Sequence, residues 1–444
     1  MTSVFGQCKK PHFLSSQQKR ITRHVWPNHP KGQSHPEKNS KVIVKVPDKS
    51  WAVKHETCQD SFSLWSNIRA DMVSKSLLSN LVILGLVLLI RGEDLKNQRH
   101  GKQFSLFNII TFEQTTCNLL SDSTLQGTCL TTSECVSQGG TVDGNCAAGF
   151  GSCCLFEIKS NTGTITKNCT YIQNPEYPST SPPSQESAFT FSRIAENLCQ
   201  IRLDFENFES AQPPSAPTLL HGDCATSGDF LTITSPTQSS PPVTCGTLTG
   251  QHMYFETGDS GTAGIAEITY GASPAMRTFK IKVTFYECDN LNKAPADCVQ
   301  YITGQNGQFE SYNFQGGQLI NNQNYVTCIR REEGYCTIQY SEASSTTSPA
   351  FDLYEDDGFI VPGDPRNAKI DATTCPTVVQ FGSTATGSGS HCGGVLNTVL
   401  DSNTPGSVIG TSSPFRVTTI FGDMLGIPDG PVAGYSLQYA QIPC

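Results

Sequence analysis

The stretch Thr278-Phe279-Lys280-Ile281-Lys282-Val283-Thr284-Phe285 alternates polar and apolar side chains without a break. Successive side chains of a strand point to opposite faces. This pattern therefore predicts a β-strand that buries one face, made of Phe279, Ile281, Val283 and Phe285. Residues 199–205 alternate in the same way, and residues 229–233 and 264–270 are further strand candidates. Proline pairs separate these segments, and no helical period follows residue 110. The sequence therefore predicts an all-β fold of β-sandwiches.

The order of these features repeats along the chain. The strand that opens at Cys199 returns at Cys336, and the strand 278–288, which closes on a cysteine, returns at 434–444. Between them, the pair Cys224 and Cys245 returns as Cys375 and Cys392, and Cys169 and Cys298 open the two units. Repetition in a fixed order predicts two consecutive copies of one β domain, over 169–288 and 298–444.

The cysteines indicate the compartment. Seventeen of the 19 cysteines lie between Cys117 and Cys444, and no CxxC…CxxC zinc spacing is present. So many cysteines predict disulfides and hence the secretory route. Residues 72–444 have a net charge of −16, which argues against nucleic-acid binding, and no cofactor is expected.

An export signal is expected inside the chain rather than at Met1. Residues 77–90 form an apolar run of fourteen residues, preceded by Met72 and Lys75 and followed by Gly92. This run is short for a membrane span, so residues 72–92 are predicted to be a signal peptide. Residues 1–71, with net charge +7, are then a disordered or spurious extension, and residues 93–116 a flexible lead-in. The alternative is a single-pass membrane protein with an uncleaved signal anchor at 77–90.

The repeated unit resembles a CUB domain, an extracellular β-sandwich with two disulfides. The resemblance rests on Asn174-Pro175-Glu176-Tyr177-Pro178 after the first cysteine, on the Ile-x-Leu-x-Phe strand after Cys199, and on Asp229-Phe230-Leu231 and Cys245-Gly246. The second unit lacks the Tyr-Pro string. The resemblance implies the pairs Cys169–Cys199 and Cys224–Cys245, and in the second unit Cys298–Cys336 and Cys375–Cys392, with Cys328 as a rival partner for Cys298.

Residues 117–156 resemble a clip domain, the small disulfide module of many arthropod extracellular proteases. The signs are Gly127-Thr128-Cys129, Cys135 and the closing pair Cys153-Cys154. The resemblance implies the pairs Cys117–Cys153, Cys129–Cys146 and Cys135–Cys154. A clip-like module before two CUB-like domains is typical of an arthropod secreted protein.

Three cysteines remain after these assignments: Cys288, Cys328 and Cys444. Cys328 has no counterpart in the first unit, and Cys288 lies in the connection between the units. We expect a Cys288–Cys328 bond and an unpaired Cys444, which could link two copies of the chain as a disulfide-bonded dimer.

Candidate sites for chemistry are few. By the resemblance, Asp229 and Asp259 fall where CUB domains place two calcium-binding aspartates, but the third carboxylate position falls near Ala211, so no metal site is predicted. The acidic run 355–358 is interpreted as a surface turn. Gly258-Asp259-Ser260-Gly261 begins like the nucleophile motif of chymotrypsin-like proteases, but no histidine has a suitable sequence context, and a catalytic Ser260 is not expected.

Two kinds of sugar attachment can be considered. Asn168-Cys169-Thr170 is the one N-glycosylation sequence after Met72, although its middle cysteine disfavours the transfer. The Ser/Thr-rich residues 341–348 could carry O-linked sugars or form a polar loop.

The functional expectation is a secreted, non-catalytic protein that binds an extracellular protein or glycan through its CUB surfaces. The alternatives are a non-catalytic regulator or pseudoenzyme partner in a clip-type protease cascade, localised by residues 117–154, and a membrane-anchored ectodomain.

Overall fold

The computed structural model describes residues 115–444, except 216–220, 238, 345–348, 354–366, 371–374, 383–388 and 423–431. The expected extension 1–71, the signal peptide 72–92 with its alternative anchor 77–90, and nearly all of the lead-in lie outside the described residues. The acidic run 355–358 and half of the Ser/Thr-rich stretch also lie outside them. Within the described part, no helix is both long and apolar enough to cross a membrane.

Residues 116–156 form a small unit, here called the disulfide-rich module. Three disulfides hold it together, Cys117–Cys153, Cys129–Cys146 and Cys135–Cys154, and these are the pairs that the clip resemblance implies. Strand β2 lies between β1 and β4, and β3 also pairs with β4. The elements are β1 (Thr116–Asn118), β2 (Gln126–Leu130), α2 (Thr132–Ser137), β3 (Thr141–Cys146), η1 (Ala147–Gly149) and β4 (Gly151–Lys159).

The short helix α2 was not expected from the sequence. Its first turn is closed by a capping box, in which the Thr131 hydroxyl accepts from the Glu134 N–H and the Glu134 carboxylate accepts from the Thr131 N–H. Six residues are too few to show a helical period, but the T-x-x-E pattern at its start is a recognisable signal.

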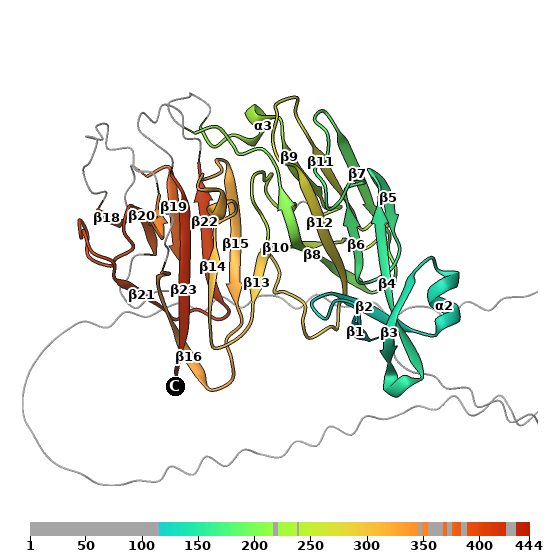
Figure 1. Ribbon diagram of the computed structural model, residues 1–444. Helices are drawn as coiled ribbons and strands as arrows, with labels where there is room; N and C mark the ends of the chain where they lie inside the picture. The colour runs from blue at the N-terminus through green and yellow to red at the C-terminus, as the bar shows by residue number, and fades with distance from the viewer. Residues whose placement is uncertain are drawn as a thin grey trace, which may run out of the picture. The chain divides into compact units, whose positions relative to one another are not determined.

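The first sandwich follows the module without a break, because β4 pairs in parallel with β6. One sheet has the order β1-β2-β4-β6-β12-β8-β10, and the facing sheet has the order β5-β7-β11-β9 (Figure 1). Its elements are β5 (Thr162–Ile165), β6 (Thr170–Gln173), β7 (Glu186–Phe191), β8 (Leu198–Glu209), α3 (Cys224–Ser227), β9 (Phe230–Thr234), β10 (His252–Glu256), β11 (Gly264–Thr269) and β12 (Thr278–Glu287).

The alternating stretch that predicted the fold is the central part of β12. Phe279, Ile281, Val283 and Phe285 are all buried in one core with the apolar residues of β8. The intervening Lys280 and Lys282 lie on the outer face of the same sheet and are only half-buried. The alternation therefore fixed which face of the strand is buried.

The second sandwich, residues 295–444, has one sheet in the order β13-β15-β22-β19-β20-β18. Its other sheet has the order β14-β23-β16-β21, and β17 also pairs with β23. A second apolar core lies between them. The elements are β13 (Cys298–Ile302), β14 (Asn306–Glu310), η2 (Phe314–Gly316), β15 (Gln323–Ile329), β16 (Tyr335–Glu342), β17 (Phe351–Asp352), β18 (Ala368–Ile370), β19 (Thr377–Phe381), β20 (Ser390–Gly393), β21 (Ser407–Gly410), β22 (Phe415–Phe421) and β23 (Gly434–Pro443).

The prediction of an all-β fold, with two β-sandwiches after a small disulfide-rich module, is confirmed for the described residues, which contain only a few short helical turns besides the strands. In each sandwich the strand that begins near the repeated cysteine pairs with the closing strand: β8 with β12, and β16 with β23. A disulfide joins each of these pairs at its end, Cys199–Cys288 and Cys336–Cys444. The bonds Cys224–Cys245 and Cys375–Cys392 are equivalent as well.

The expected bond Cys169–Cys199 is wrong. Cys169 directly precedes β6, and β12 lies between β6 and β8, the strand of Cys199. Two strand spacings amount to about 9–10 Å, beyond the roughly 7 Å that a disulfide spans between Cα atoms. Cys169 is instead an unpaired, buried thiol.

The expected bonds Cys298–Cys336 and Cys288–Cys328 are also wrong. Cys298 and Cys336 lie in opposite sheets of the second sandwich, whereas β13 and β15 are neighbours and the bond formed is Cys298–Cys328, the rival pairing. Cys444 is bonded to Cys336, so the free terminal thiol that motivated a disulfide-linked dimer is not present.

The two sandwiches pack against each other through side chains and hydrogen bonds. Tyr312, Ile320 and Tyr325 of the second unit are part of the core cluster of the first. At the junction of β10 with β13, the Tyr301 N–H donates to Nε2 of His252 at 3.0 Å. The Gln323 amide donates to the Val243 carbonyl oxygen at 2.8 Å, so the junction is polar as well as apolar.

Candidate functional site

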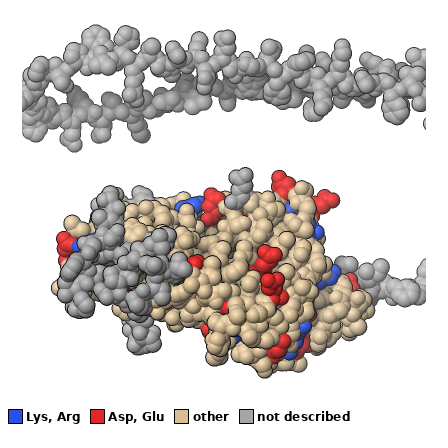
Figure 2. All heavy atoms as spheres, turned by 90° about the horizontal axis from the view of Figure 1, so that it is seen from above, with Lys and Arg blue, Asp and Glu red and all other residues tan. Residues whose placement is uncertain are grey.

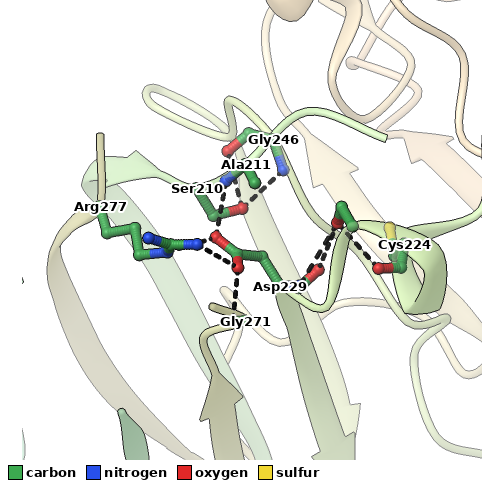
Figure 3. A network of polar contacts seen from close by, with 8 residues as sticks. Ser210, Ala211, Cys224, Asp229, Gly246, Gly271 and Arg277 are labelled. Atoms are coloured by element: carbon green, nitrogen blue, oxygen red, sulfur yellow. Dashed lines mark hydrogen bonds and ion pairs between the residues drawn. The ribbon is translucent and has the colours of Figure 1, made fainter. Parts of the chain in front are cut away.

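Asp229, the first calcium candidate, is a structural residue. Its carboxylate accepts from Nε and Nη2 of Arg277 at 2.8 and 2.9 Å and from the N–H groups of Ala211 and Gly271 at 2.8 and 2.7 Å (Figure 3). Both charged side chains are buried, with exposed fractions of 0% and 1%. All the strong acceptor positions of the carboxylate are therefore used within the protein, and none is left for a cation.

Asp259, the second candidate, does not lie with Asp229. Asp229 directly precedes β9, whereas Gly258 lies against Pro236, which follows the end of β9. A five-residue strand is about 17 Å long, so the two aspartates lie at opposite ends of it. The described residues contain no group of three or more His, Cys, Asp or Glu side chains that could hold a metal.

Ser260 lies exposed in the loop between β10 and β11. The three described histidines hydrogen-bond elsewhere: His221 with Gln318, His252 with Tyr301 and His391 with the Asn397 carbonyl. Among the described residues, no hydrogen bond joins Ser260 to a histidine, and the arrangement that serine chemistry requires is not formed around it.

A cleft lined mostly by polar side chains lies between the disulfide-rich module and the outer face of β8 and β12. This polar cleft has a volume of about 480 Å³. It is lined by Thr116, Thr124, Gln126, Asn168, Cys169, Arg202, Asp204, Glu206, Lys282, Thr284, Phe285, Tyr286, Asn290 and Asn292.

The charged side chains of the polar cleft are partly paired within it. Nε of Arg202 donates to the Asp204 carboxylate at 2.7 Å, and Nζ of Lys282 donates to the Gln126 side-chain oxygen at 2.5 Å. The pKa of Glu206 lies above its usual value because the side chain loses part of its hydration and stands near the charge of Asp204. With two basic and two acidic residues, the cleft has no net formal charge.

Cys169 and Asn168 form the part of the cleft next to the module. Burial raises the pKa of the Cys169 thiol, an effect that Lys282 and the hydroxyls of Thr116 and Thr128 reduce. The Asn168 side-chain oxygen accepts from the N–H groups of Cys169 and Phe285, both at 2.9 Å. The proposed sugar attachment at Asn168 is therefore at an ordered position beside β12.

A second unusual surface lies on the module itself. Four of the eleven exposed large apolar side chains among the described residues lie within 116–156: Leu120, Val136, Val142 and Phe150. Leu120 is 81% exposed. Yet its N–H donates to the Asp143 carboxylate at 3.1 Å, as does the N–H of Ser121 at 3.0 Å. The Leu120 side chain is thus exposed to solvent, whereas its backbone is fixed by hydrogen bonds to Asp143.

Sequence reasoning missed both surfaces, for different reasons. Arg202 and Asp204 occupy the polar positions of an alternating strand, as Lys282 does, so the pattern itself placed them on an outer face. What the pattern did not reveal is that the module packs beside that face. The hydrogen bond between the Leu120 N–H and the Asp143 carboxylate joins residues 23 positions apart, and no local sequence pattern predicts it.

Comparisons with known proteins place the second sandwich in a family. Residues 295–442 match the family model of the animal CUB domain. The match falls on the unit that lacks the Tyr-Pro string and spans β13 to β23. The comparison with curated proteins gave no match.

Solved structures similar to the chain include the CUB1-EGF-CUB2 domains of rat MASP-1, with 12% identity, a TM-score of 0.22, and coverage of 63% of this chain and 99% of that one. The CUB1-EGF-CUB2 domain of human MASP-1/3 has 14% identity, a TM-score of 0.20, and coverage of 61% and 98%. The full extracellular region of zebrafish Gpr126/Adgrg6 has 12% identity, a TM-score of 0.23, and coverage of 63% and 36%. From the family match, residues 295–442 are a CUB domain.

Proposed function

We propose that this chain is a secreted, non-catalytic protein that binds another extracellular protein through its disulfide-rich module, which is carried on a body of two packed β-sandwiches. The proposal rests chiefly on the observation that the Leu120 side chain is strongly exposed while its backbone is fixed by a hydrogen bond to Asp143. The CUB domain at 295–442 supports the class of function, since CUB domains are generally binding modules.

The contacts that fix the backbone around Leu120 lower the conformational entropy that is lost when a partner binds. The Asp143 carboxylate holds the backbone of Leu120 and Ser121, and the disulfide Cys117–Cys153 fixes the strand just before them. An anchor that is already ordered loses little conformational entropy on binding, so more of its buried area contributes to affinity. Isolated exposed leucines are common on protein surfaces, but this module of 41 residues exposes four large apolar side chains, so it offers apolar surface to a partner.

The charges around these side chains indicate the partner's chemistry. Residues 116–156 contain Asp122, Glu134 and Asp143 and no Lys, Arg or His. The pKa of each carboxyl is lowered chiefly by a hydroxyl that hydrogen-bonds to it, from Thr124, Thr131 and Ser121 respectively, so all three are ionised at neutral pH. A module that exposes both apolar side chains and fixed negative charges fits a partner surface that is apolar and basic.

The extracellular location is supported by the cysteines. Sixteen of the 17 described cysteines form eight disulfides. Such bonds persist in oxidising compartments and are rare in the cytosol. On the face of the described body seen in Figure 2, acidic and basic side chains are interspersed among mostly uncharged residues.

Retention of a partner tests the proposal. The wild type and the double variant Leu120→Ser/Val142→Thr would be immobilised and exposed to extracellular fluid of the source organism. Leu291→Ser is the matched control, because Leu291 is 93% exposed but lies outside the module. We expect a protein that is retained by the wild type and the control and lost from the double variant. A partner of the protease class would favour the cascade alternative. Equal retention by all three proteins would contradict the proposal.

Secretion is tested separately. If translation starts at Met72 and residues 72–92 are removed, material recovered from the medium should begin near Glu93. Peptides from residues 1–71 in that material would reject the signal peptide, and a chain retained in the membrane would favour the anchor.

A further inference from the structure

The side-chain amide of Asn168 lies beside the polar cleft. Its side-chain oxygen is engaged by two backbone N–H groups, and Nδ2 makes no hydrogen bond within the described residues. Asn168 is half-buried, and Nδ2 is not among the fully buried, unpartnered polar atoms of the described residues, so the protein does not enclose it completely. Because Asn168 lines the polar cleft, the open side of Nδ2 is the cleft or its rim.

The residues that follow Asn168 complete an acceptor sequence for an N-linked sugar, Asn168-Cys169-Thr170, and it is the one such sequence in the described residues. The middle residue, Cys169, forms no disulfide. The acceptor sequence is therefore not constrained by a disulfide bond when the glycan-transferring enzyme binds it. We propose that Asn168 carries an N-linked glycan and that its first sugars occupy the polar cleft. The inference rests on the proposed extracellular location and adds the chemical class of what fills the cleft.

The attachment is an ordinary group transfer. Nδ2 of Asn168 forms a bond to C1 of the first N-acetylglucosamine, while the bond between that C1 and the diphosphate of a lipid-linked oligosaccharide breaks. The amide loses one proton, and the lipid diphosphate leaves with the electron pair of the broken bond. The donor belongs to the secretory compartment, and the folded protein need only leave room for the product.

The lining of the cleft suits neutral sugars. The cleft has equal numbers of acidic and basic residues, so it has no excess charge that would attract an ionic ligand. Arg202 and Lys282 also hydrogen-bond to Asp204 and Gln126. Amide and hydroxyl groups such as those of Thr284, Asn290 and Asn292 offer both donors and acceptors, as sugar hydroxyls require. The volume of about 480 Å³ lies in the range of ligand pockets and leaves room for the first sugars.

The glycan would have a second effect. Cys169 is the one unpaired cysteine of the described residues, and it lines the same cleft. Cys169 is only 2% exposed, so in an oxidising compartment its thiol can exchange with disulfides only when a reactant enters the cleft. Sugars lying over the cleft would restrict the approach of other thiols to Cys169.

The first test measures occupancy. The full chain would be produced in secreting animal cells, and its intact mass compared before and after peptide N-glycosidase. Asn168→Asp removes Nδ2 but keeps the oxygen that accepts from Phe285, whereas Thr170→Ser keeps both the sequence and the hydroxyl that donates to the Lys167 carbonyl oxygen. We expect the loss of one glycan from the wild type and Thr170→Ser, and none from Asn168→Asp. If Asn168→Asp does not fold, Thr170→Val removes the acceptor sequence instead. A secreted wild type whose mass is unchanged by the enzyme overturns the inference.

The second test measures where the sugars lie. Alkylation of Cys169 in the folded wild type should become severalfold faster after the glycan is removed, and Asn168→Asp should react at that faster rate from the start. Equal rates with and without the glycan would show that it points away from the cleft, which overturns this part of the inference. Loss of the glycan from a secreted chain leaves the proposed function standing, whereas a chain that stays in the cytosol without a glycan contradicts both.

Discussion

Arg277 and Asp229 form a two-pronged ion pair in which neither side chain reaches solvent. Arg277 directly precedes β12 and Asp229 directly precedes β9, so the pair ties the two sheets of the first sandwich together. The same carboxylate also receives the N–H groups of Ala211 and Gly271. One residue that the sequence suggested as a metal ligand thus holds three other residues in place: Ala211, Gly271 and Arg277.

Asp229→Asn should strongly destabilise the first sandwich. The change leaves the Arg277 guanidinium buried without a counter-charge, and breaking one side of a buried pair costs about 3–5 kcal/mol. The control is Arg330→Ala, which breaks the Arg330–Glu332 pair on the surface, where the arginine is 44% exposed and a loss of about 1 kcal/mol or less is expected. Urea unfolding measures both free energies. Similar losses for the two variants would contradict this account of Asp229.

Calcium should leave the thermal stability of the chain unchanged. Asp229 has no acceptor position left for a cation, and Asp259 lies at the other end of β9. A ligand that binds only the folded state must raise the melting temperature, so the absence of a metal-binding group among the described residues predicts equal values in calcium and in chelator. A rise of several degrees, measured by differential scanning calorimetry, would show that another set of oxygens binds the ion.

The junction of the two sandwiches should weaken in acid through His252. Burial lowers the pKa of His252 to about 3, and the Arg202 guanidinium acts in the same direction. The neutral ring accepts from Tyr301, and protonation removes that acceptor. Because the pKa is about 6.5 in the unfolded chain, the stabilisation is present above pH 6.5 and is lost as the pH falls toward 3.

The size of this effect follows from linkage. Each pH unit below 6.5 removes up to about 1.4 kcal/mol, or roughly 3 kcal/mol near pH 4.5. His252→Gln keeps a hydrogen-bond acceptor without a proton to gain, so its free energy of unfolding should fall less between neutral pH and acid. Parallel pH profiles for the wild type and His252→Gln would rule out His252 as the cause.

The strands and the repeat could be read from the sequence because they are local patterns. The alternation at 278–285 located β12 and its buried face, and the order of cysteines located the second copy. The disulfides were harder, because a bond depends on which strands are neighbours. The repeat already matched Cys199 with Cys336 and Cys288 with Cys444, and their pairing becomes evident once β8 is known to lie beside β12.

The candidate site was less predictable for the same reason. Asp229 was noticed, but Arg277 is 48 positions away and no local pattern links the two. Similarly, the Cys169 thiol and Asn168 were noticed as sequence features, whereas the cleft that they line exists only because the module packs beside β12. Contacts between distant segments are set by the tertiary fold and leave little trace in a single sequence.

The disulfide pattern predicts one reactive cysteine between Cys117 and Cys444. Alkylation of the denatured, non-reduced protein, followed by peptide mapping, should label Cys169 and no other cysteine of that range. The terminal Cys444 is bonded to Cys336, so non-reducing electrophoresis should show no dimer linked through it. Label on Cys444 or Cys288 would contradict the pairing.

The most direct test of the central claim, that the module is the binding surface, is site-specific photo-cross-linking. A photo-reactive amino acid would replace Leu120 in one protein and the similarly exposed Leu291 in another, and each would be irradiated in the extracellular fluid of the source organism. The account predicts one dominant adduct from position 120, formed with a partner segment that contains apolar and basic residues, and no such adduct from position 291. The same adduct from both positions, or none from position 120, would contradict it.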